Sequence, residues 1–145
     1  MKYIKDYKIF EEEYYTEEDL EEFKNKLPIF AKFIRNFITQ FGYECSDMSE
    51  GDDVMFSFYV KNTDKILFSI MTGDDEYIVL DSFNNSNNIM VSEIPEYLKT
   101  IKGIRFNKQI LDEYEFYITG DINDVIDQID KDKLTMFASA KKYNV

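Results

Sequence analysis

Two short acidic triplets are the residues of this chain that are best placed to carry chemistry. Gly51-Asp52-Asp53 precedes one apolar run, and Gly73-Asp74-Asp75, extended by Glu76, precedes another. Grouped carboxylates can bind the Lys and Arg side chains of a protein partner, or they can hold Mg²⁺ or Ca²⁺. The spacing does not match an EF-hand loop, which needs oxygen ligands at alternate positions and a closing Glu. A solvated acidic surface is the simplest interpretation, a docking site for a basic protein the second and a cation site the third.

The composition disfavours most catalytic chemistries. The 145-residue chain has no histidine and a single cysteine, Cys45. Histidine is the usual general base near neutral pH, so Ser-His-Asp and Cys-His catalysis are both missing, and zinc sites lack their usual ligands. With five glycines in the chain, no phosphate-binding loop or Rossmann glycine pattern occurs. We therefore expect no enzyme activity, no cofactor and no metal, with a carboxylate metal-dependent enzyme left open as an alternative.

The stretch around the two triplets predicts a three-stranded antiparallel meander. Residues 54–60 and 66–71 show the alternation of half-buried strands, and 77–81 form a third apolar run. Turn residues separate these runs. In a meander the chain enters the first strand at the end where the second hairpin turns. We therefore expect five carboxylates to gather at that end, as a contact for a partner: Asp52, Asp53, Asp74, Asp75 and Glu76.

An apolar stripe predicts a long N-terminal helical region. Apolar residues recur at steps of three and four from Leu20 to Phe41. Pro28 lies inside the stripe, and proline usually breaks or kinks a helix. We therefore expect one helix at 17–27, a break or kink, and a second, buried helix at 28–41 that ends at Gly42.

The start of this helical region is strongly acidic. Residues 11–22 hold eight carboxylates and no basic residue. Thr16 followed by Asp19 resembles a capping box, and acidic residues suit the positive end of a helix dipole, so a solvated helix start is the simpler interpretation. The functional alternative is an acidic strip that a basic partner recognises, through Glu17, Glu18 and Glu21.

The rest of the chain predicts shorter elements. Alternation at 114–119 is typical of an amphipathic strand, and apolar steps after Asp121 indicate a C-terminal helix split near 130–133. We expect a single α+β domain over residues 1–145, in which an antiparallel sheet of four or five strands packs against the N-terminal and C-terminal helices. The remaining segments are interpreted as an arm or edge strand at 1–15, a connector at 43–53, a mobile polar loop at 82–88, a short helix at 92–101 and a strand at 104–107.

The net charge limits the classes of partner. The chain has 29 Asp and Glu against 17 Lys and Arg, a net charge of −12. This balance disfavours nucleic acid, whose phosphates need Lys and Arg, and it disfavours anionic membrane surfaces. With no signal peptide, no membrane-length apolar run and one unpaired cysteine, we expect a soluble cytoplasmic protein. The charge favours a basic protein partner.

Three functional hypotheses follow from these patterns. The first is a non-catalytic acidic protein that blocks a basic, nucleic-acid-handling partner, as an immunity protein or a phage anti-defence inhibitor would. The second is a dimeric secretion-type chaperone that holds an extended client on the outer face of the sheet, since both faces of the meander are partly apolar; a homodimer is compatible with this pattern. The third is the metal-dependent enzyme.

Two resemblances accompany these hypotheses. The order of elements over residues 17–142 resembles that of bacterial secretion chaperones in outline. Small size and acidity resemble immunity proteins and phage-encoded inhibitors of host defence nucleases in composition. These resemblances imply a binding protein rather than a catalyst.

Overall fold

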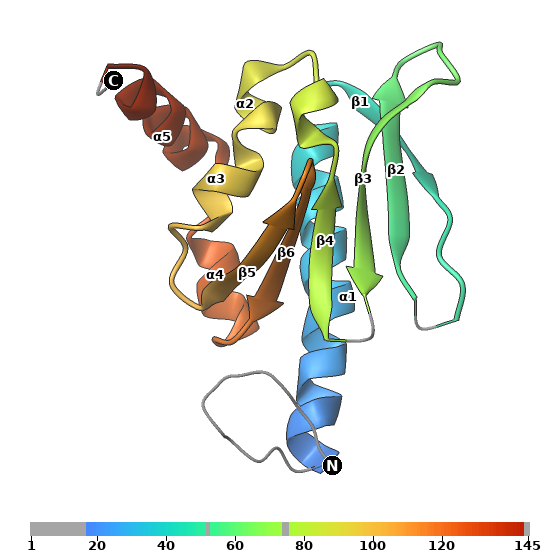
Figure 1. Cartoon of the computed structure of the whole chain (residues 1–145), viewed down its shortest axis with the longest axis vertical. Coiled ribbons are helices and arrows are strands. Elements are labelled where there is room, and N and C mark those ends of the chain that lie inside the picture. The colour runs from blue at the N-terminus through green and yellow to red at the C-terminus, as the bar shows by residue number, and fades with distance from the viewer. Residues whose placement is uncertain (1–16, 52, 74–75, 144–145) are drawn as a thin grey trace.

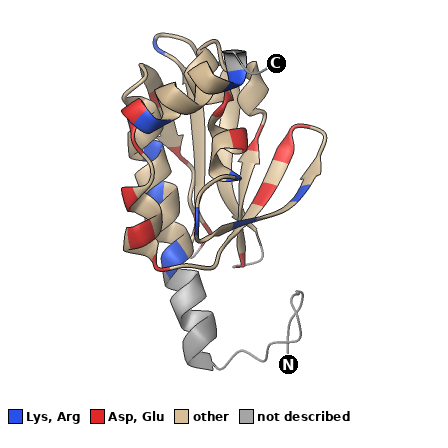
Figure 2. Cartoon of the chain, turned by 90° about the vertical axis from the view of Figure 1, so that its left-hand side faces the viewer, with Lys and Arg blue, Asp and Glu red and all other residues tan. Residues whose placement is uncertain are grey.

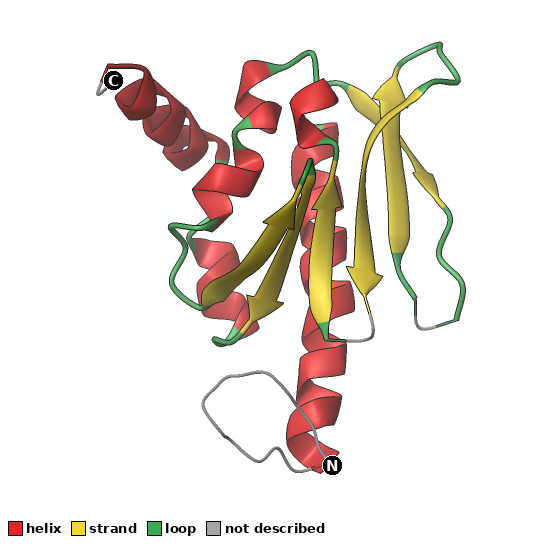
Figure 3. Cartoon of the chain, viewed as in Figure 1, coloured by secondary structure: helices red, strands yellow, loops and turns green. Residues whose placement is uncertain are grey.

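The structure is a computed structural model that describes residues 17–51, 53–73 and 76–143, with side chains between Lys26 and Lys141. Within these ranges the chain forms one six-stranded sheet with five α-helices and a short 3-10 helix (Figures 1 and 3). The expected α+β class is therefore confirmed, and the expected arm or edge strand at 1–15 lies outside the described residues. In chain order the elements are α1 (Glu17–Thr39), β1 (Tyr43–Asp47), β2 (Met55–Val60), β3 (Ile66–Gly73), β4 (Tyr77–Asp81), η1 (Phe83–Asn85), α2 (Ile89–Ser92), α3 (Ile94–Leu98), β5 (Ile104–Ile110), β6 (Glu113–Ile118), α4 (Ile122–Asp127) and α5 (Lys131–Tyr143).

The sheet has the strand order β1-β2-β3-β4-β6-β5, and each neighbouring pair is antiparallel. Strands β2, β3 and β4 are the expected meander. The sheet has six strands instead of four or five because Tyr43–Asp47, interpreted from the sequence as part of a connector, pairs with β2 from Tyr43↔Val60 to Asp47↔Phe56. An edge strand of 5 residues is too short to show clear alternation, so long-range pairing decides its conformation.

Helix α1 is one continuous helix that contains Pro28, so of the expected break or kink the break is wrong. Proline costs about 3 kcal/mol in a helix interior. On either side of it Leu27 and Phe30 are buried against the sheet, and each such side chain contributes about 1.5–3 kcal/mol on burial. Packing of the apolar stripe therefore offsets the local cost. The helix ends at Thr39, and Gly42 adopts a φ of +95° in the turn into β1.

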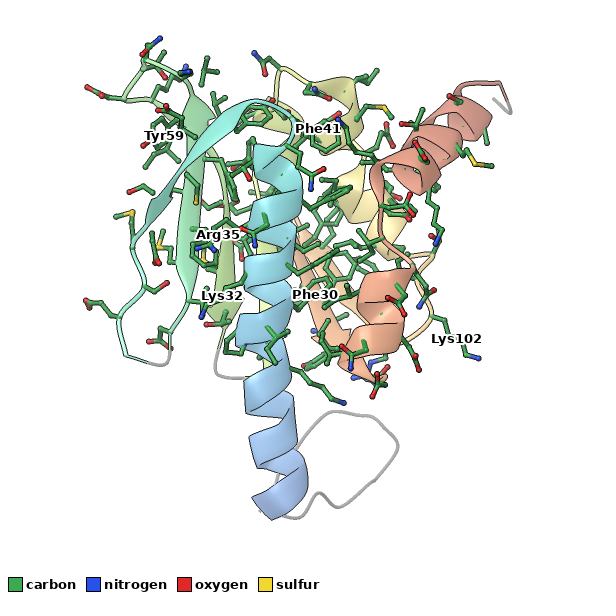
Figure 4. The ribbon with its side chains drawn as sticks, turned by 180° about the vertical axis from the view of Figure 1, so that it is seen from behind. Phe30, Lys32, Arg35, Phe41, Tyr59 and Lys102 are labelled. Carbon is green, nitrogen blue, oxygen red and sulfur yellow. The ribbon has the colours of Figure 1, made fainter. Side chains whose placement is uncertain are left out.

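The two faces of the sheet have different surroundings. Helix α1 lies along one face, with α4 and α5 on the same side (Figures 1 and 4). Between this face and the helices lies the core, which includes Phe58, Phe68, Ile70, Leu80 and Phe116. The alternate strand residues point to the opposite face, and among the described residues no helix lies across β2, β3 and β4 there (Figure 1). We call it the outer face, made up of Met55, Ser57, Tyr59, Ser69, Met71, Tyr77, Val79, Glu115 and Tyr117.

The segment at 82–88 is bonded into the fold rather than forming the expected mobile loop. The Tyr43 hydroxyl donates to Asn87 Oδ1 at 2.6 Å and accepts from the Asn88 backbone N–H at 3.1 Å. The Phe83 ring is fully buried. Asn88 then caps α2 by accepting from the backbone N–H groups of Met90 and Val91. The short helix expected at 92–101 therefore begins earlier and consists of α2 and α3.

The C-terminal helical region is split as expected, into α4 and α5. The Asp121 carboxylate caps α4 by accepting from the backbone N–H groups of Asn123 and Asp124. The Asp130 carboxylate accepts from the Lys133 N–H at 2.8 Å at the start of α5. Among the described residues, no helix combines the length and the apolar character that crossing a bilayer requires.

Candidate binding surface

The described residues of the two acidic triplets lie at one end of the sheet. The Thr72 N–H donates to the Val54 carbonyl at 3.0 Å, and the Val54 N–H donates to Thr72 Oγ1 at 3.0 Å. Asp53 precedes Val54 directly, and the Glu76 N–H donates to the Gly73 carbonyl at 3.1 Å. Asp53 and Glu76 are both exposed. Asp52, Asp74 and Asp75 lie outside the described residues, so the gathering of all five carboxylates stays a prediction.

The glycines of the two triplets have different structural roles. Gly51 adopts a φ of +58° in a tight turn, across which Glu50 and Asp53 exchange backbone hydrogen bonds of 2.9 Å. Gly73 has no positive φ, but a Cβ there would come within 2.6 Å of the Tyr77 ring. That ring also stacks on Tyr117, with 6.0 Å between ring centres. Local backbone geometry and ring packing thus explain both glycines without a bound ligand.

The second predicted contact lies at the start of α1. Glu17, Glu18 and Glu21 are helical, and their side chains lie outside the described part of the structure. Figure 1 shows the N-terminal end of α1 extending beyond the sheet, at the end where β3 turns into β4. The start of α1 and the described residues Asp53 and Glu76 therefore belong to the same end of the molecule, which we call the acidic end.

The outer face combines apolar, aromatic and charged side chains. One cross-strand row consists of Met55, Met71, Val79 and Glu115. Glu115 is buried, and its carboxylate accepts from Asn107 Nδ2 at 3.1 Å and lies 3.9 Å from Lys108 Nζ. Such a mixture suits contact with another protein better than contact with lipid.

The charges of the described chain are mixed in sign. Figure 2 shows Asp and Glu on both helices and strands of one side, with Lys and Arg between them. Internal pairs account for part of the basic set: Lys99 lies 3.0 Å from Glu96, and Lys141 lies 2.9 Å from Glu93. The described basic residues are therefore partly neutralised by carboxylates of the same chain.

An open pocket of about 600 Å³ lies at the free edge of β1. Figure 4 shows Arg35 on the side of α1 that faces the edge strands. The Arg35 guanidinium lies 4.8 Å from the centre of the Phe56 ring. The pocket brings the Cys45 thiol together with the carboxylates of Glu44 and Asp47. Its lining consists of Arg35, Thr39, Tyr43, Glu44, Cys45, Asp47 and Tyr59.

Cys45 in this pocket should react slowly. Burial disfavours the thiolate and raises the pKa of Cys45 from 9.0 to about 11, and the smaller effect of Arg35 does not reverse this. Since the thiolate is the nucleophile, we expect alkylation by iodoacetamide at pH 8 to be about 100-fold slower than for a thiol with the ordinary pKa. The rate should rise with pH toward pH 11. The same chain unfolded in urea is the control, and equal rates in the two states would contradict the burial argument.

The described residues contain no site that would support the metal-dependent alternative. Within 17–51, 53–73 and 76–143, no group of three or more Asp, Glu or Cys side chains is arranged to hold a metal ion. Three of the five carboxylates that would make such a site are outside these ranges, so the alternative is not tested by the fold.

One exposed feature was missed by sequence reasoning. The turn between β5 and β6 carries Ile110 and Leu111, both exposed. Turns of this kind usually carry Gly, Asn or Asp. An apolar pair at a turn position was therefore the signal in the sequence, but it becomes visible only once both strand boundaries are known.

Comparison with known proteins gave no match: no protein-family model, no curated protein and no solved structure matches this chain.

Proposed function

We propose that this chain is a non-catalytic binding protein whose acidic end docks onto a basic surface of a protein partner and blocks it. The observation that carries the proposal is the pairing of Val54 with Thr72, which brings exposed Asp53 and Glu76 to one end of the sheet. The net charge of −12 supports it. Proteins that handle nucleic acid present Lys and Arg to phosphates. An immunity or anti-defence inhibitor of such a protein is the class that fits best.

Complementary charge alone would give such a complex a fast association rate and selectivity for its partner, but not high affinity. An exposed ion pair contributes about 0–1 kcal/mol and weakens with salt. Complementary charge mainly raises the association rate and excludes partners of like charge. Tight binding therefore also needs apolar contact, which partly exposed Met55 and Met71 on the adjoining outer face can supply.

Reversing the described charges of the acidic end tests the proposal. The double variant Asp53→Lys with Glu76→Lys should lower partner affinity roughly 10-fold at low salt, because two attractive contacts become repulsive. It should also flatten the dependence of affinity on salt. The partner is recovered from host extract with the wild-type chain, and its affinity is then measured by biolayer interferometry at three salt concentrations.

A matched control distinguishes an effect of the location of the reversed charges from an effect of the change in net charge. Asp64→Lys with Asp132→Lys makes the same change in net charge at two exposed residues away from the acidic end. We expect this control to keep most of the wild-type affinity. Equal losses in the two double variants would contradict the site, and unchanged affinity in both would remove charge-driven docking altogether.

A second candidate function is a dimeric chaperone of the secretion type. The observation that favours it is the outer face, which carries partly exposed Met55, Tyr59 and Met71 with no described helix across it. Such a chaperone would be a stable dimer in light scattering and would hold an unfolded client. A monomer that does not retard aggregation of an unfolded protein would remove this candidate.

A further inference from the structure

We infer that the turn between β5 and β6 is an apolar anchor that inserts into a nonpolar pocket with a basic rim on the same protein partner. We call this turn the hairpin tip; it consists of Ile110, Leu111, Asp112 and Glu113. The inference rests on the proposed function, because it adds an apolar contact to the charged one. It is nevertheless tested by a different variant with a different dependence on salt.

The exposure of the hairpin tip is the first observation. Residue Leu111 is 88% exposed and residue Ile110 is 54% exposed. Single exposed apolar residues are common on protein surfaces and need no explanation. Two large apolar residues in succession at the end of a projecting turn are less common, because a turn normally carries polar residues. Nothing in the described fold packs over Leu111 enough to bury it.

Backbone conformation is the second and independent observation. Leu111 adopts a φ of +56°, in the left-handed region that favours glycine. Ser82, whose N–H donates to the Asp112 carbonyl at 3.0 Å, adopts a φ of +64°. Two of the three described non-glycine residues with positive φ are therefore Leu111 itself and the residue that bonds to its neighbour Asp112. A backbone conformation held against local preference is often found at functional sites, so it supports a functional role for the hairpin tip.

The hairpin tip is also held in a fixed position. Asn84 Nδ2 donates to the Asp112 carboxylate at 3.0 Å, and Gln109 Nε2 donates to the Leu111 carbonyl at 2.9 Å. The 3-10 helix that carries Asn84 is itself anchored by the buried Phe83. A rigid apolar group loses little conformational entropy when it enters a pocket. This is the behaviour expected of an interface anchor.

The neighbours of Leu111 indicate the chemistry of the partner. Exposed Asp112 and Glu113 follow it directly, so the pocket that receives the leucine should have basic residues at its rim. The same carboxylates, with a net charge of −12, oppose insertion into an anionic membrane. A protein surface with Lys or Arg around a nonpolar pocket satisfies both requirements.

The position of the hairpin tip allows one partner to contact it and the acidic end together. Strand β4 pairs with β6 at Asp81↔Glu113, beside the tip, and with β3 at Tyr77↔Gly73, beside the acidic end. From Tyr77 to Asp81 the chain makes four residue steps, roughly 13 Å at about 3.3 Å per residue, so the tip lies at least that far from the part of the acidic end that carries Asp53 and Glu76. A standard interface of about 800 Å² per partner spans more than this distance.

Leu111→Gly is the decisive variant because it removes the apolar side chain, while glycine readily adopts the positive φ of this position. Glycine adopts a φ of +56° without strain, so the melting temperature should stay unchanged or rise. Affinity for the partner recovered from host extract should fall 10-fold or more. The slope of log affinity against log salt should stay that of the wild type, since no charge is removed. Met136→Ala, at a 70% exposed residue on α5, is the control and should bind as the wild type does.

Each result of this experiment decides the inference. Unchanged affinity of Leu111→Gly overturns it, and so does a melting temperature lowered by many degrees, because the leucine would then be structural. Flotation of the wild-type chain with phosphatidylcholine vesicles, lost in Leu111→Gly, would replace the protein pocket with a membrane and also overturn it. If Leu111→Gly weakens binding while Asp53→Lys with Glu76→Lys does not, the anchor stands and the proposed function fails. If Asp53→Lys with Glu76→Lys weakens binding while Leu111→Gly does not, the proposed function stands and only the anchor fails.

Discussion

Replacing Phe68 with alanine should lower the free energy of unfolding by about 3–5 kcal/mol. The Phe68 ring is buried and contacts three other rings, with centre distances of 5.1 Å to Tyr43, 5.0 Å to Phe58 and 4.6 Å to Phe83. These rings come from β1, β2 and η1, so one side chain joins three segments that are distant in sequence. Its removal leaves a cavity that none of the three can fill without moving its own backbone.

Urea unfolding followed by circular dichroism measures this loss. Ile66→Ala is the matched control, because Ile66 lies on the same strand and is 52% exposed. We expect it to cost less than about 1 kcal/mol, as surface substitutions usually do. Similar losses for the two variants would show that the ring cluster does not hold β1 and η1 to the meander.

Gly120→Ala should destabilise the fold by about 2–4 kcal/mol, because it forces two backbone segments apart. A Cβ on Gly120 would lie 2.8 Å from Gly103 Cα, which belongs to the backbone and has no side chain to rotate away. The Gly103 carbonyl also accepts from the backbone N–H groups of Thr119 at 2.8 Å and Gly120 at 3.0 Å. Separating the segments would break these hydrogen bonds as well as the packing of Val125 beside them.

Gly73→Ala is the control for this substitution. Both glycines lack a positive φ, so backbone strain does not differ between them. At Gly73 the new Cβ meets the Tyr77 ring at 2.6 Å, and this partly exposed ring can move aside at the cost of its stacking on Tyr117. We expect a loss below about 1 kcal/mol for Gly73→Ala in the same urea experiment. A loss as large as that of Gly120→Ala would contradict the distinction between backbone and side-chain contacts.

Local pattern was sufficient for the meander and for the split C-terminal helix. Alternation and turn residues lie within the same few residues as the strands they predict, so β2, β3 and β4 match expectation closely. Asp121 and Asp130 cap helices by bonding to N–H groups two or three residues away, which is equally local. Helices and strands that are determined by residues close to them in the sequence can therefore be predicted from the sequence alone.

The expectations from sequence were wrong where contacts between residues far apart in the chain determine the local conformation. The continuous helix through Pro28 depends on burial against a sheet that begins after the helix has ended. Strand β1 exists because β2 offers it a partner and because Tyr43 bonds to the segment at 86–88. A polar loop such as 82–88 looks mobile until the residues that accept its hydrogen bonds are known.

The sequence by itself determined the mixed α and β composition, the excess of negative charge, the lack of histidine and the two acidic triplets. Only the tertiary structure decided that Asp53 and Glu76 occupy one end of the sheet and that Leu111 stands exposed with a left-handed backbone at the other end of β4. The physical reason is that composition and period are properties of neighbouring residues. A binding surface, in contrast, is assembled by strand pairing between residues far apart in the chain.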